Sequence, residues 1–326
     1  MSIQPVFIFS LPRSGSTLVQ RVLAAHPEVA SAAEPWFLLP LMYSLREEGA
    51  SADYGHGLAA RAVNDFALSL PGGKRDYASA IRQFAMQLYS RSGGPAVRYF
   101  VDKTPRYHLV IRELLDTFPD AKCVLIWRNP LAVAASILTT WGERGRWNLY
   151  RYNVDLYKGL ENLCAAGQEL GNRFFTFRYE EAVAEDSVIW EQLFRYLELS
   201  YDSHLLNSFA SVRFSGRMGD PTGPAKYQVI SAASINDWAG SFSSILRRAW
   251  ARRYLAWIGD ERLSLMGYDR SQLLTVLDRG ERTARARFAS DAVLMGLGAL
   301  HAPFDLSGIK RQIRPVLHGR RSYALT

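Results

Sequence analysis

Short apolar runs recur along the chain, and longer stretches with helical spacing of apolar residues separate them. The runs cover residues 6–9, 99–101, 123–127 and 173–177. Runs this short, bounded by polar residues, are typical of buried strands. Because they alternate with helical stretches, the sequence predicts an α/β domain with a central, mostly parallel sheet flanked by helices.

Capping signals mark the starts of several helices. Thr104-Pro105 and Asn129-Pro130 each place a capping residue before a proline in the first helical turn, directly after a strand. Another helix is expected to begin near Ser14 and to stop at His26-Pro27. Further helices are predicted at residues 58–70, 77–90 and 150–170, and loops at residues 48–57 and 215–226.

The strand signals fade after about residue 268. We therefore predict one domain over residues 1–270 and a C-terminal extension over residues 271–326. Five cations and no acid lie between Lys310 and Arg321. A segment of this charge suits peripheral contact with an anionic membrane or acceptor, and we expect it to be dispensable for nucleotide binding.

Composition adds a positive charge without choosing its partner. Of the 326 residues, 48% are hydrophobic and 21% are charged, and the formal net charge is +8. A basic surplus suits a nucleotide, a nucleic acid, a membrane surface or an acidic glycan. No Cys/His cluster has metal-ligand spacing, so Cys123 and Cys164 are expected to be buried thiols. With neither a leader nor an apolar run of membrane-spanning length, a cytoplasmic location is expected.

The strongest local signal is Phe7-Ile-Phe-Ser-Leu-Pro-Arg-Ser-Gly-Ser-Thr17, in which an apolar strand leads through a glycine turn into a helix. Free backbone N–H groups and the positive end of the helix dipole converge at such a turn and form an anion site. The plainer interpretation is an ordinary strand–turn–helix corner. The side chains that would add a charge and hydroxyl donors are Arg13, Ser14, Ser16 and Thr17.

This turn is not a Walker A loop. That loop needs a lysine directly after its second glycine, where the lysine reaches the phosphates. In this chain Ser16 follows Gly15. A metal-dependent kinase or NTPase therefore loses its main support.

A second signal lies at the end of the run 123–127. Arg128 follows the strand directly, and Ser136 lies in the second turn of the next helix. An arginine there can grip a phosphate with two donors while the serine hydroxyl donates to the same group. The plainer interpretation is a surface arginine and a helix serine.

Four candidate side chains follow the ends of predicted strands within a few residues: Arg13, Lys103, Arg128 and Tyr179. The carboxyl ends of parallel strands share one edge of a sheet, where ligands bind in open α/β folds. Three cations at one edge are costly unless an anion neutralises them. We therefore expect a ligand with two separated anionic groups.

At this point a family resemblance becomes plain. Leu11-Pro-Arg-Ser-Gly-Ser-Thr17 resembles the 5′-phosphosulfate-binding loop of sulfotransferases that use 3′-phosphoadenosine 5′-phosphosulfate (PAPS). Arg128 with Ser136 resembles their 3′-phosphate motif, and Phe177-Arg-Tyr-Glu-Glu181 resembles a third family stretch. Val101-Asp-Lys-Thr-Pro-Arg-Tyr107, and Ala25-His-Pro-Glu-Val29 with Glu34 beyond it, are most similar to the tyrosylprotein and bacterial branch. The similarity covers about residues 5–260 and implies a P-loop-like three-layer fold.

The resemblance implies sulfuryl transfer to an acceptor hydroxyl, with 3′-phosphoadenosine 5′-phosphate (PAP) as product and no metal. Glu34 would be the general base, since a hydroxyl is a poor nucleophile until its proton is taken. Lys103 and Arg13 would stabilise the charge that develops on the leaving phosphate. The implied donor-binding residues are Arg13, Ser14, Gly15, Ser16 and Thr17 for the 5′-phosphosulfate, Arg128 and Ser136 for the 3′-phosphate, Tyr179 beside the nucleotide, and Lys226 in a closing loop.

Plainer interpretations of the catalytic residues stay open. Glu34 would also favour a helix start, and Lys103 would also suit a solvated site. His26 precedes a helix-stopping proline and His108 falls inside a helix, so both are weaker candidates for the base. Thr140 stands where the tyrosylprotein branch has an arginine, and Pro35-Trp36-Phe37 replaces its basic acceptor-site residues, which disfavours an acidic peptide acceptor.

Two other functions compete with sulfuryl transfer, namely a metal-dependent phosphotransferase and a non-catalytic module for nucleic acid or anionic glycan. The expected partner is a small-molecule, lipid or glycan acceptor with a hydroxyl, and no nucleic acid. Four aromatic side chains are expected first as core and second as the lining of an acceptor pocket: Trp36, Phe37, Trp141 and Trp147.

Overall fold

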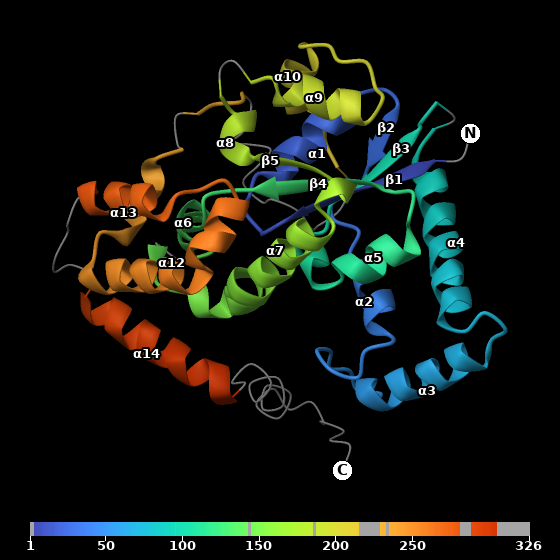
Figure 1. The fold of residues 1–326 in the computed structure, drawn as a ribbon, viewed down its shortest axis with the longest axis horizontal. Coiled ribbons are helices and arrows are strands. Elements are labelled where there is room, and N and C mark those ends of the chain that lie inside the picture. The colour runs from blue at the N-terminus through green and yellow to red at the C-terminus, as the bar shows by residue number, and fades with distance from the viewer. Residues whose placement is uncertain are drawn as a thin grey trace, which may run out of the picture.

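The central sheet is all-parallel, with the strand order β2-β3-β1-β4-β5 (Figure 1). The strands of this computed structural model are β1 Gln4–Ser10, β2 Val29–Ser31, β3 Tyr99–Asp102, β4 Lys122–Trp127 and β5 Phe174–Arg178. The structure describes residues 3–94, 96–142, 145–184, 187–214, 229–232, 235–280 and 288–304. Three of these strands contain a predicted apolar run and β5 begins one residue after the start of the fourth run, so the predicted parallel sheet is confirmed.

Helices connect the strands and cover the sheet. In the described residues they are α1 Ser16–Ala24, α2 Leu38–Tyr43, α3 His56–Ser69, α4 Lys74–Ser92, η1 Pro105–Leu109, α5 Ile111–Thr117, α6 Pro130–Trp141, η3 Leu149–Tyr152, η4 Val154–Gly159, α7 Leu160–Glu169, η5 Gly171–Arg173, α8 Tyr179–Ala182, α9 Ile189–Tyr196, α10 Leu205–Ser208, η6 Phe209–Ser211, η7 Asp237–Phe242, α12 Ile245–Leu265, α13 Arg270–Arg279 and α14 Phe288–Phe304.

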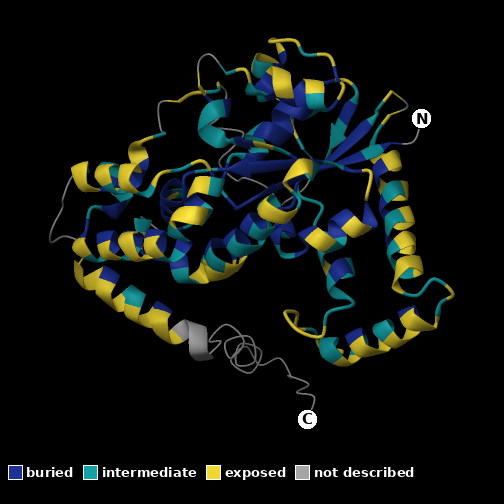
Figure 2. Cartoon of the chain, viewed as in Figure 1, coloured by how far each residue is buried: buried dark blue, intermediate teal, exposed yellow. Residues whose placement is uncertain are grey.

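Alternate residues of the strands build two cores, because successive side chains of a strand point to opposite faces. Val6 and Ile8 of β1 pack with α1 and α9 on one face. Phe7 and Phe9 pack with α5, α6, α7 and α12 on the other. The result is the expected three-layer arrangement, with buried residues concentrated along the sheet (Figure 2).

Three local predictions need correction. The three-residue edge strand β2 was not predicted, because it is too short to show an alternating pattern. The helix predicted at residues 150–170 is divided into the 3₁₀ turn η3, the π-helix η4 and α7. Pro105 opens only a 3₁₀ helix without a side-chain cap, whereas Asn129 caps α6 as predicted by accepting from Leu131 N and Ala132 N.

The chain beyond residue 270 continues as α13 and then, after residues outside the description, as α14. Leu273 and Leu277 of α13 belong to the same core as the α5–α7 face of the sheet. The division into two parts near residue 270 stays a prediction, and the basic segment from Lys310 to Arg321 lies outside the described residues.

Both cysteines are free and buried, as expected, and burial raises the pKa of each thiol to about 12. Among the helices that the structure describes, none combines the length and apolarity needed to cross a bilayer.

Candidate functional site

The turn between β1 and α1 leaves the start of α1 open for a ligand. Gly15 is the N-cap residue, and within the described residues no side chain caps this helix. The first N–H groups of a helix have no partner inside it, so they are available to an anion. Arg13, just before this position, adopts a left-handed backbone conformation with φ of 67°. Ser14 and Ser16 are buried in the turn.

Tyr179, the first residue of α8, lies directly against Gly15. A Cβ atom on Gly15 would lie 2.1 Å from Cδ2 of Tyr179, and φ of Gly15 is 86°. Only glycine combines that backbone conformation with so close an approach. The tyrosine ring therefore forms a wall of the cavity beside the loop, which is lined by Arg13, Gly15, Ser16, Thr17, Leu18, Arg128 and Tyr179.

Arg128, which follows β4, connects the tyrosine with the loop. Its Nη1 donates to the backbone oxygen of Arg13 at 2.6 Å, and its guanidinium lies 4.5 Å from the ring centroid of Tyr179. The Nε atom of Arg128 is buried and has no hydrogen-bond partner among the described residues. An unpartnered charged donor at a cavity wall fits an anionic ligand group.

The side chain of Arg13 reaches across the cavity to α6. Its Nε donates to Oγ of Ser136 at 3.2 Å, and its guanidinium lies 5.6 Å from the ring centroid of Trp141. Arg13 thus stands between the two predicted anion sites instead of pointing only at the loop. Trp141, expected first as core, is partly buried against the core and also contacts the guanidinium of Arg13.

Glu34 and Lys103 form a nearly buried ion pair at the same edge of the sheet. Nζ of Lys103 lies 2.5 Å from Oε1 of Glu34, and the two side chains are 3% and 9% exposed. Nε1 of Trp36 donates to Oε2 of Glu34 at 3.1 Å. Lys103 directly follows β3, which pairs with β1, so the pair lies beside the strand that leads into the loop.

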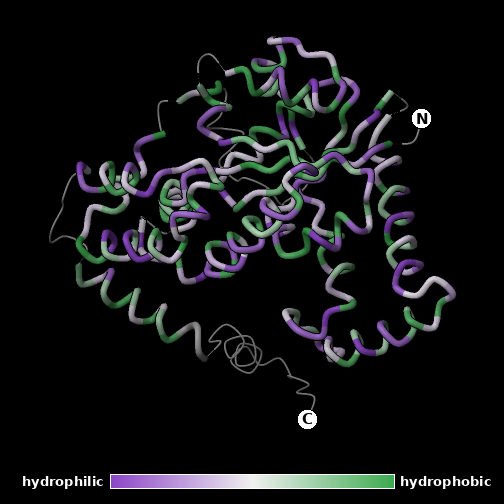
Figure 3. The backbone as a smooth tube through the Cα atoms, in the orientation of Figure 1, coloured by the Kyte–Doolittle hydropathy of each residue, from purple (hydrophilic) through white to green (hydrophobic). Residues whose placement is uncertain are grey.

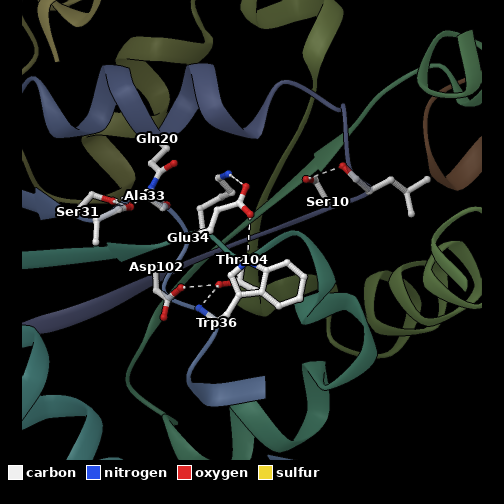
Figure 4. A network of polar contacts seen from close by, with 11 residues as sticks. Ser10, Gln20, Ser31, Ala33, Glu34, Trp36, Asp102 and Thr104 are labelled. Atoms are coloured by element: carbon white, nitrogen blue, oxygen red, sulfur yellow. Dashed lines mark hydrogen bonds and ion pairs between the residues drawn. The ribbon is translucent and has the colours of Figure 1, made fainter. Parts of the chain in front are cut away.

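Gln20 of α1 fastens the segment that leads to Glu34. Its Nε2 donates to Oγ of Ser31 and to the backbone oxygens of Ala32 and Ala33, at 2.7–3.0 Å. Oγ of Ser31 in turn donates to the backbone oxygen of Val101 at 2.6 Å. Figure 4 shows this chain of contacts from α1 through residues 31–34 to the end of β3. The backbone before Glu34 is therefore fixed from both sides.

Asp102 anchors the residues on the other side of Glu34. It is fully buried and accepts hydrogen bonds from Tyr89, Tyr107 and Thr104. Burial raises the pKa of Asp102 to about 6, and the three hydroxyl donors and Lys103 oppose that rise. Oγ1 of Thr104 also accepts from the backbone N–H of Trp36, whose φ is 59°. A bulky residue seldom adopts this conformation, so these contacts hold a strained turn directly after Glu34.

The comparison with known protein families agrees with this geometry. A family model described as the sulfotransferase family matches residues 5–203. The chain belongs to the sulfotransferase family.

The chain is also similar to known proteins and, in its fold, to a solved structure. The nodulation protein NoeE of Sinorhizobium fredii is 37% identical over 137 residues, which cover 42% of the chain and 31% of NoeE. Protein-tyrosine sulfotransferase 1 of Danio rerio is 22% identical over 271 residues, which cover 81% of the chain and 72% of that protein. The chain thus spans less than a third of the first of these relatives. A sulfotransferase domain from the curacin biosynthetic pathway has the same fold, with a TM-score of 0.54, 24% identity, and coverage of 82% of this chain and 98% of that one.

Within this sulfotransferase fold, the predicted residues form two adjoining groups. One group, around the turn before α1, consists of Arg13, Ser14, Gly15, Ser16, Thr17, Arg128, Ser136 and Tyr179. The other contains Glu34 and Lys103. Lys226 lies outside the described residues.

The two histidines have partners of their own. The ring of His26 contacts Oγ of Ser200 at 3.2 Å, and burial lowers its pKa. The ring of His108 contacts Oδ1 of Asp155 at 3.0 Å, buried against η4. In the described structure neither histidine forms a hydrogen bond or ion pair with Glu34 or Lys103, and neither lines the cavity.

The residues that position Glu34 were missed in the sequence. Asp102 stood next to Lys103 in a stretch already singled out, so an apolar strand ending in a carboxylate was an available signal. Gln20 and Tyr89 gave no signal, because a helical glutamine and a helical tyrosine are ordinary residues. Among the described residues, no group of three or more histidine, cysteine or acidic side chains has metal-site geometry.

Proposed function

We propose that the protein transfers the sulfuryl group of PAPS to an acceptor hydroxyl, with Glu34 as the general base. The observation that carries the proposal is the meeting of Arg13, Arg128 and Tyr179 around the uncapped start of α1, with the Glu34–Lys103 pair at the end of the neighbouring strand β3. Membership of the sulfotransferase family supports this function over a metal-dependent phosphotransferase or a passive anion-binding module.

The donor has an anionic group at each end, and the cavity has a cation for each. The N–H groups of the turn and the hydroxyls of Ser16 and Thr17 suit the 5′-phosphosulfate. Arg128, whose Nε lacks a partner among the described residues, suits the 3′-phosphate together with Ser136. On binding, Arg13 would exchange its contact with Ser136 for one with PAPS; the serine hydroxyl, which accepts in that contact, keeps its own hydrogen to donate to the 3′-phosphate.

In the proposed step the oxygen of the acceptor attacks sulfur in line with the leaving group. Glu34 accepts the hydroxyl proton while the new O–S bond forms. The bond from sulfur to the 5′-phosphate oxygen breaks, and that oxygen keeps the electron pair. Arg13 and Lys103 stabilise the charge that it gains. Each carboxylate oxygen of Glu34 has a second lone pair beyond its contact with Lys103 or Trp36, so the carboxylate can still receive a proton.

Calorimetric titration with PAP and with AMP tests the nucleotide site. The protein should bind PAP far more tightly than AMP, because only PAP has a 3′-phosphate. Arg128→Ala should weaken PAP binding by about 10- to 100-fold, the range expected for lost charge-assisted hydrogen bonds, and should change AMP binding little. Arg195→Ala, at an exposed arginine of α9, is the matched control. Equal affinities for PAP and AMP in the unmodified protein would overturn this site.

The acceptor is proposed to be a small molecule, lipid or glycan that carries a hydroxyl, in a cytoplasmic setting and without nucleic acid. The segment from Lys310 to Arg321 is proposed to contact an anionic membrane. Incubation with labelled PAPS and a panel of glycan, lipid and phenolic hydroxyls tests the acceptor class. Magnesium-dependent transfer of the γ-phosphate of labelled ATP, without transfer from PAPS, would instead favour the phosphotransferase.

A further inference from the structure

The helix α14 buries a charged residue and exposes apolar ones, the reverse of an ordinary surface helix. Surface helices of globular proteins normally bury their apolar stripe and expose their charges. In α14 the charged residue Asp291 is 0% exposed, whereas Val293, Leu297 and Leu300 are 63%, 49% and 53% exposed. Figure 2 shows exposed residues along most of the helix, and Figure 3 shows largely hydrophobic residues there. Two questions follow: which interaction fixes the orientation of the helix, and which partner covers its apolar face.

A buried ion pair fixes the orientation of α14. Asp291 accepts from Nε and Nη2 of Arg247, both at 2.8 Å, and from Oγ of Ser244 at 2.9 Å. Two helical turns further along, Gly298 packs closely on η3. A Cβ atom on Gly298 would lie 2.8 Å from Cβ of Tyr150. Asp291 and Gly298 are seven residues apart and so share one face of the helix. This inward face cannot rotate outward without leaving Arg247 unpaired.

Because Asp291 and Gly298 fix the inward face, the apolar residues of α14 face outward. Ala289, Val293, Gly296, Leu297 and Leu300 follow the i, i+4, i+7, i+8, i+11 spacing of a single stripe. Phe288 adds a further exposed ring at the start of the helix. Among the exposed residues at positions 288–300, Ser290 is the one polar side chain and none is charged. We define residues 289, 293, 296, 297 and 300 as the α14 stripe.

We propose that the α14 stripe inserts into the surface of an anionic lipid bilayer. The inference extends the proposed membrane contact of the basic segment, since Lys310 to Arg321 follows α14 closely and contributes five cations without an acid. An apolar helix face next to a polybasic segment combines the two terms that hold peripheral proteins on anionic membranes, apolar insertion and charge attraction. A second copy of this chain fits the stripe less well, because each copy carries a formal net charge of +8 and the two would repel each other.

Cosedimentation of the full chain with vesicles tests the proposal without any need for PAPS or an acceptor. Vesicles of phosphatidylcholine containing one third phosphatidylglycerol should bind the protein, and pure phosphatidylcholine vesicles should bind it much less. The double variant Val293→Asp/Leu297→Asp should bind the anionic vesicles at least about tenfold more weakly, because two charges would enter the apolar boundary. Raised salt should weaken the binding of the unmodified protein.

A matched control separates insertion of α14 from general stickiness. Leu58→Asp/Phe66→Asp places the same charges at exposed apolar positions of α3 and should leave vesicle binding unchanged. Circular dichroism on heating should show that both double variants are folded. The proposal is overturned if the unmodified protein does not bind anionic vesicles, or if the α14 variant binds them as well as the α3 variant. If the unmodified protein is a dimer that does not bind lipid, and the α14 variant is a monomer, the stripe is instead an interface between two copies of the chain.

Discussion

Glu34 already has a donor at each carboxylate oxygen, Lys103 at one and Trp36 at the other. Glu34→Gln keeps the shape of the side chain and removes its ability to take a proton. Turnover should therefore fall by about 10²-fold or more, as for loss of a general base, while PAP affinity stays within a few fold. Steady-state rates with labelled PAPS and calorimetry with PAP measure the two quantities.

The neighbouring Glu28 offers a control for this substitution. Its carboxylate pairs with Arg98 at 3.2 Å, where both side chains are about one third exposed. Glu28→Gln should leave turnover near that of the unmodified protein. If Glu34→Gln were equally active, the base would lie elsewhere, and His26 and His108 would be the next residues to substitute.

Gly15 is a position where one methyl group should have a large effect. Ala at this position would need φ of 86° and would place its Cβ against the ring of Tyr179. Both the strain and the displaced ring should reshape the anion site, so Gly15→Ala should weaken PAP binding by about tenfold or more. Gly171→Ala, where a Cβ meets nothing within 4 Å, should leave PAP binding unchanged in the same titration.

Single residues also show how far the sequence leads toward the site. Arg13, Arg128 and Lys103 could be predicted because each follows a strand within three residues, and strand ends fix where side chains gather. The contact of Arg13 with Ser136 could not, because it depends on the rotamer of a long side chain across the cavity. The role of Gln20 was equally hidden, since its three acceptors lie at the end of β2 and just after it, and the pattern did not reveal that strand.

At the scale of elements, the β2–α2 connection is held between α1 and β3, and Asp102 at the end of β3 is its buried anchor. The ordinary pKa of this carboxyl is 3.8, and in the folded protein it is raised to about 6. Between these two values the folded state binds more protons than the unfolded state. The free energy of unfolding contributed by Asp102 is therefore fully present below about pH 4 and is lost as the pH rises through about 6.

Asp102→Asn should remove this pH dependence. The stability of the unmodified protein relative to the variant should decline by at most about 3 kcal/mol from pH 4 to pH 7, since each pKa unit corresponds to about 1.4 kcal/mol. Urea unfolding of both proteins at several pH values measures the difference, and pH effects from all other groups cancel. Parallel stability curves for the two proteins would contradict the raised pKa.

The elements themselves could be predicted where their signals are strong. The four apolar runs are strands, and Asn129-Pro130 begins a helix, because burial and capping act locally. The π-helix η4 could not be foreseen in the stretch 150–170. Its wider turn lies where the ring of His108 packs against Gly159, and a Cβ there would lie 2.7 Å from that ring. Tertiary packing thus overrode a regular helical pattern.

At the scale of the whole molecule, the Arg247–Asp291 pair joins α14 to the rest of the described fold. Asp291→Ala would leave a guanidinium that is 3% exposed without its carboxylate partner, and should cost about 3–5 kcal/mol of unfolding free energy. Arg247→Met in the same chain should recover part of that loss. Glu47→Ala, which breaks a pair whose side chains are more than half exposed, should cost less than about 1 kcal/mol in the same urea experiment.

The strand order affects how the chain folds while the ribosome is still making it. β1 is made first and lies at the centre of the sheet, but its neighbours β3 and β4 begin only at Tyr99 and Lys122. During synthesis the backbone edges of β1 therefore stay unpaired, and its apolar faces stay uncovered, until both partner strands and the intervening α3–α4 segment have left the ribosome. Contacts so distant in sequence form slowly, and an unpaired apolar strand is a site of aggregation in the meantime. We expect newly made chains to depend on chaperones that shield this first strand.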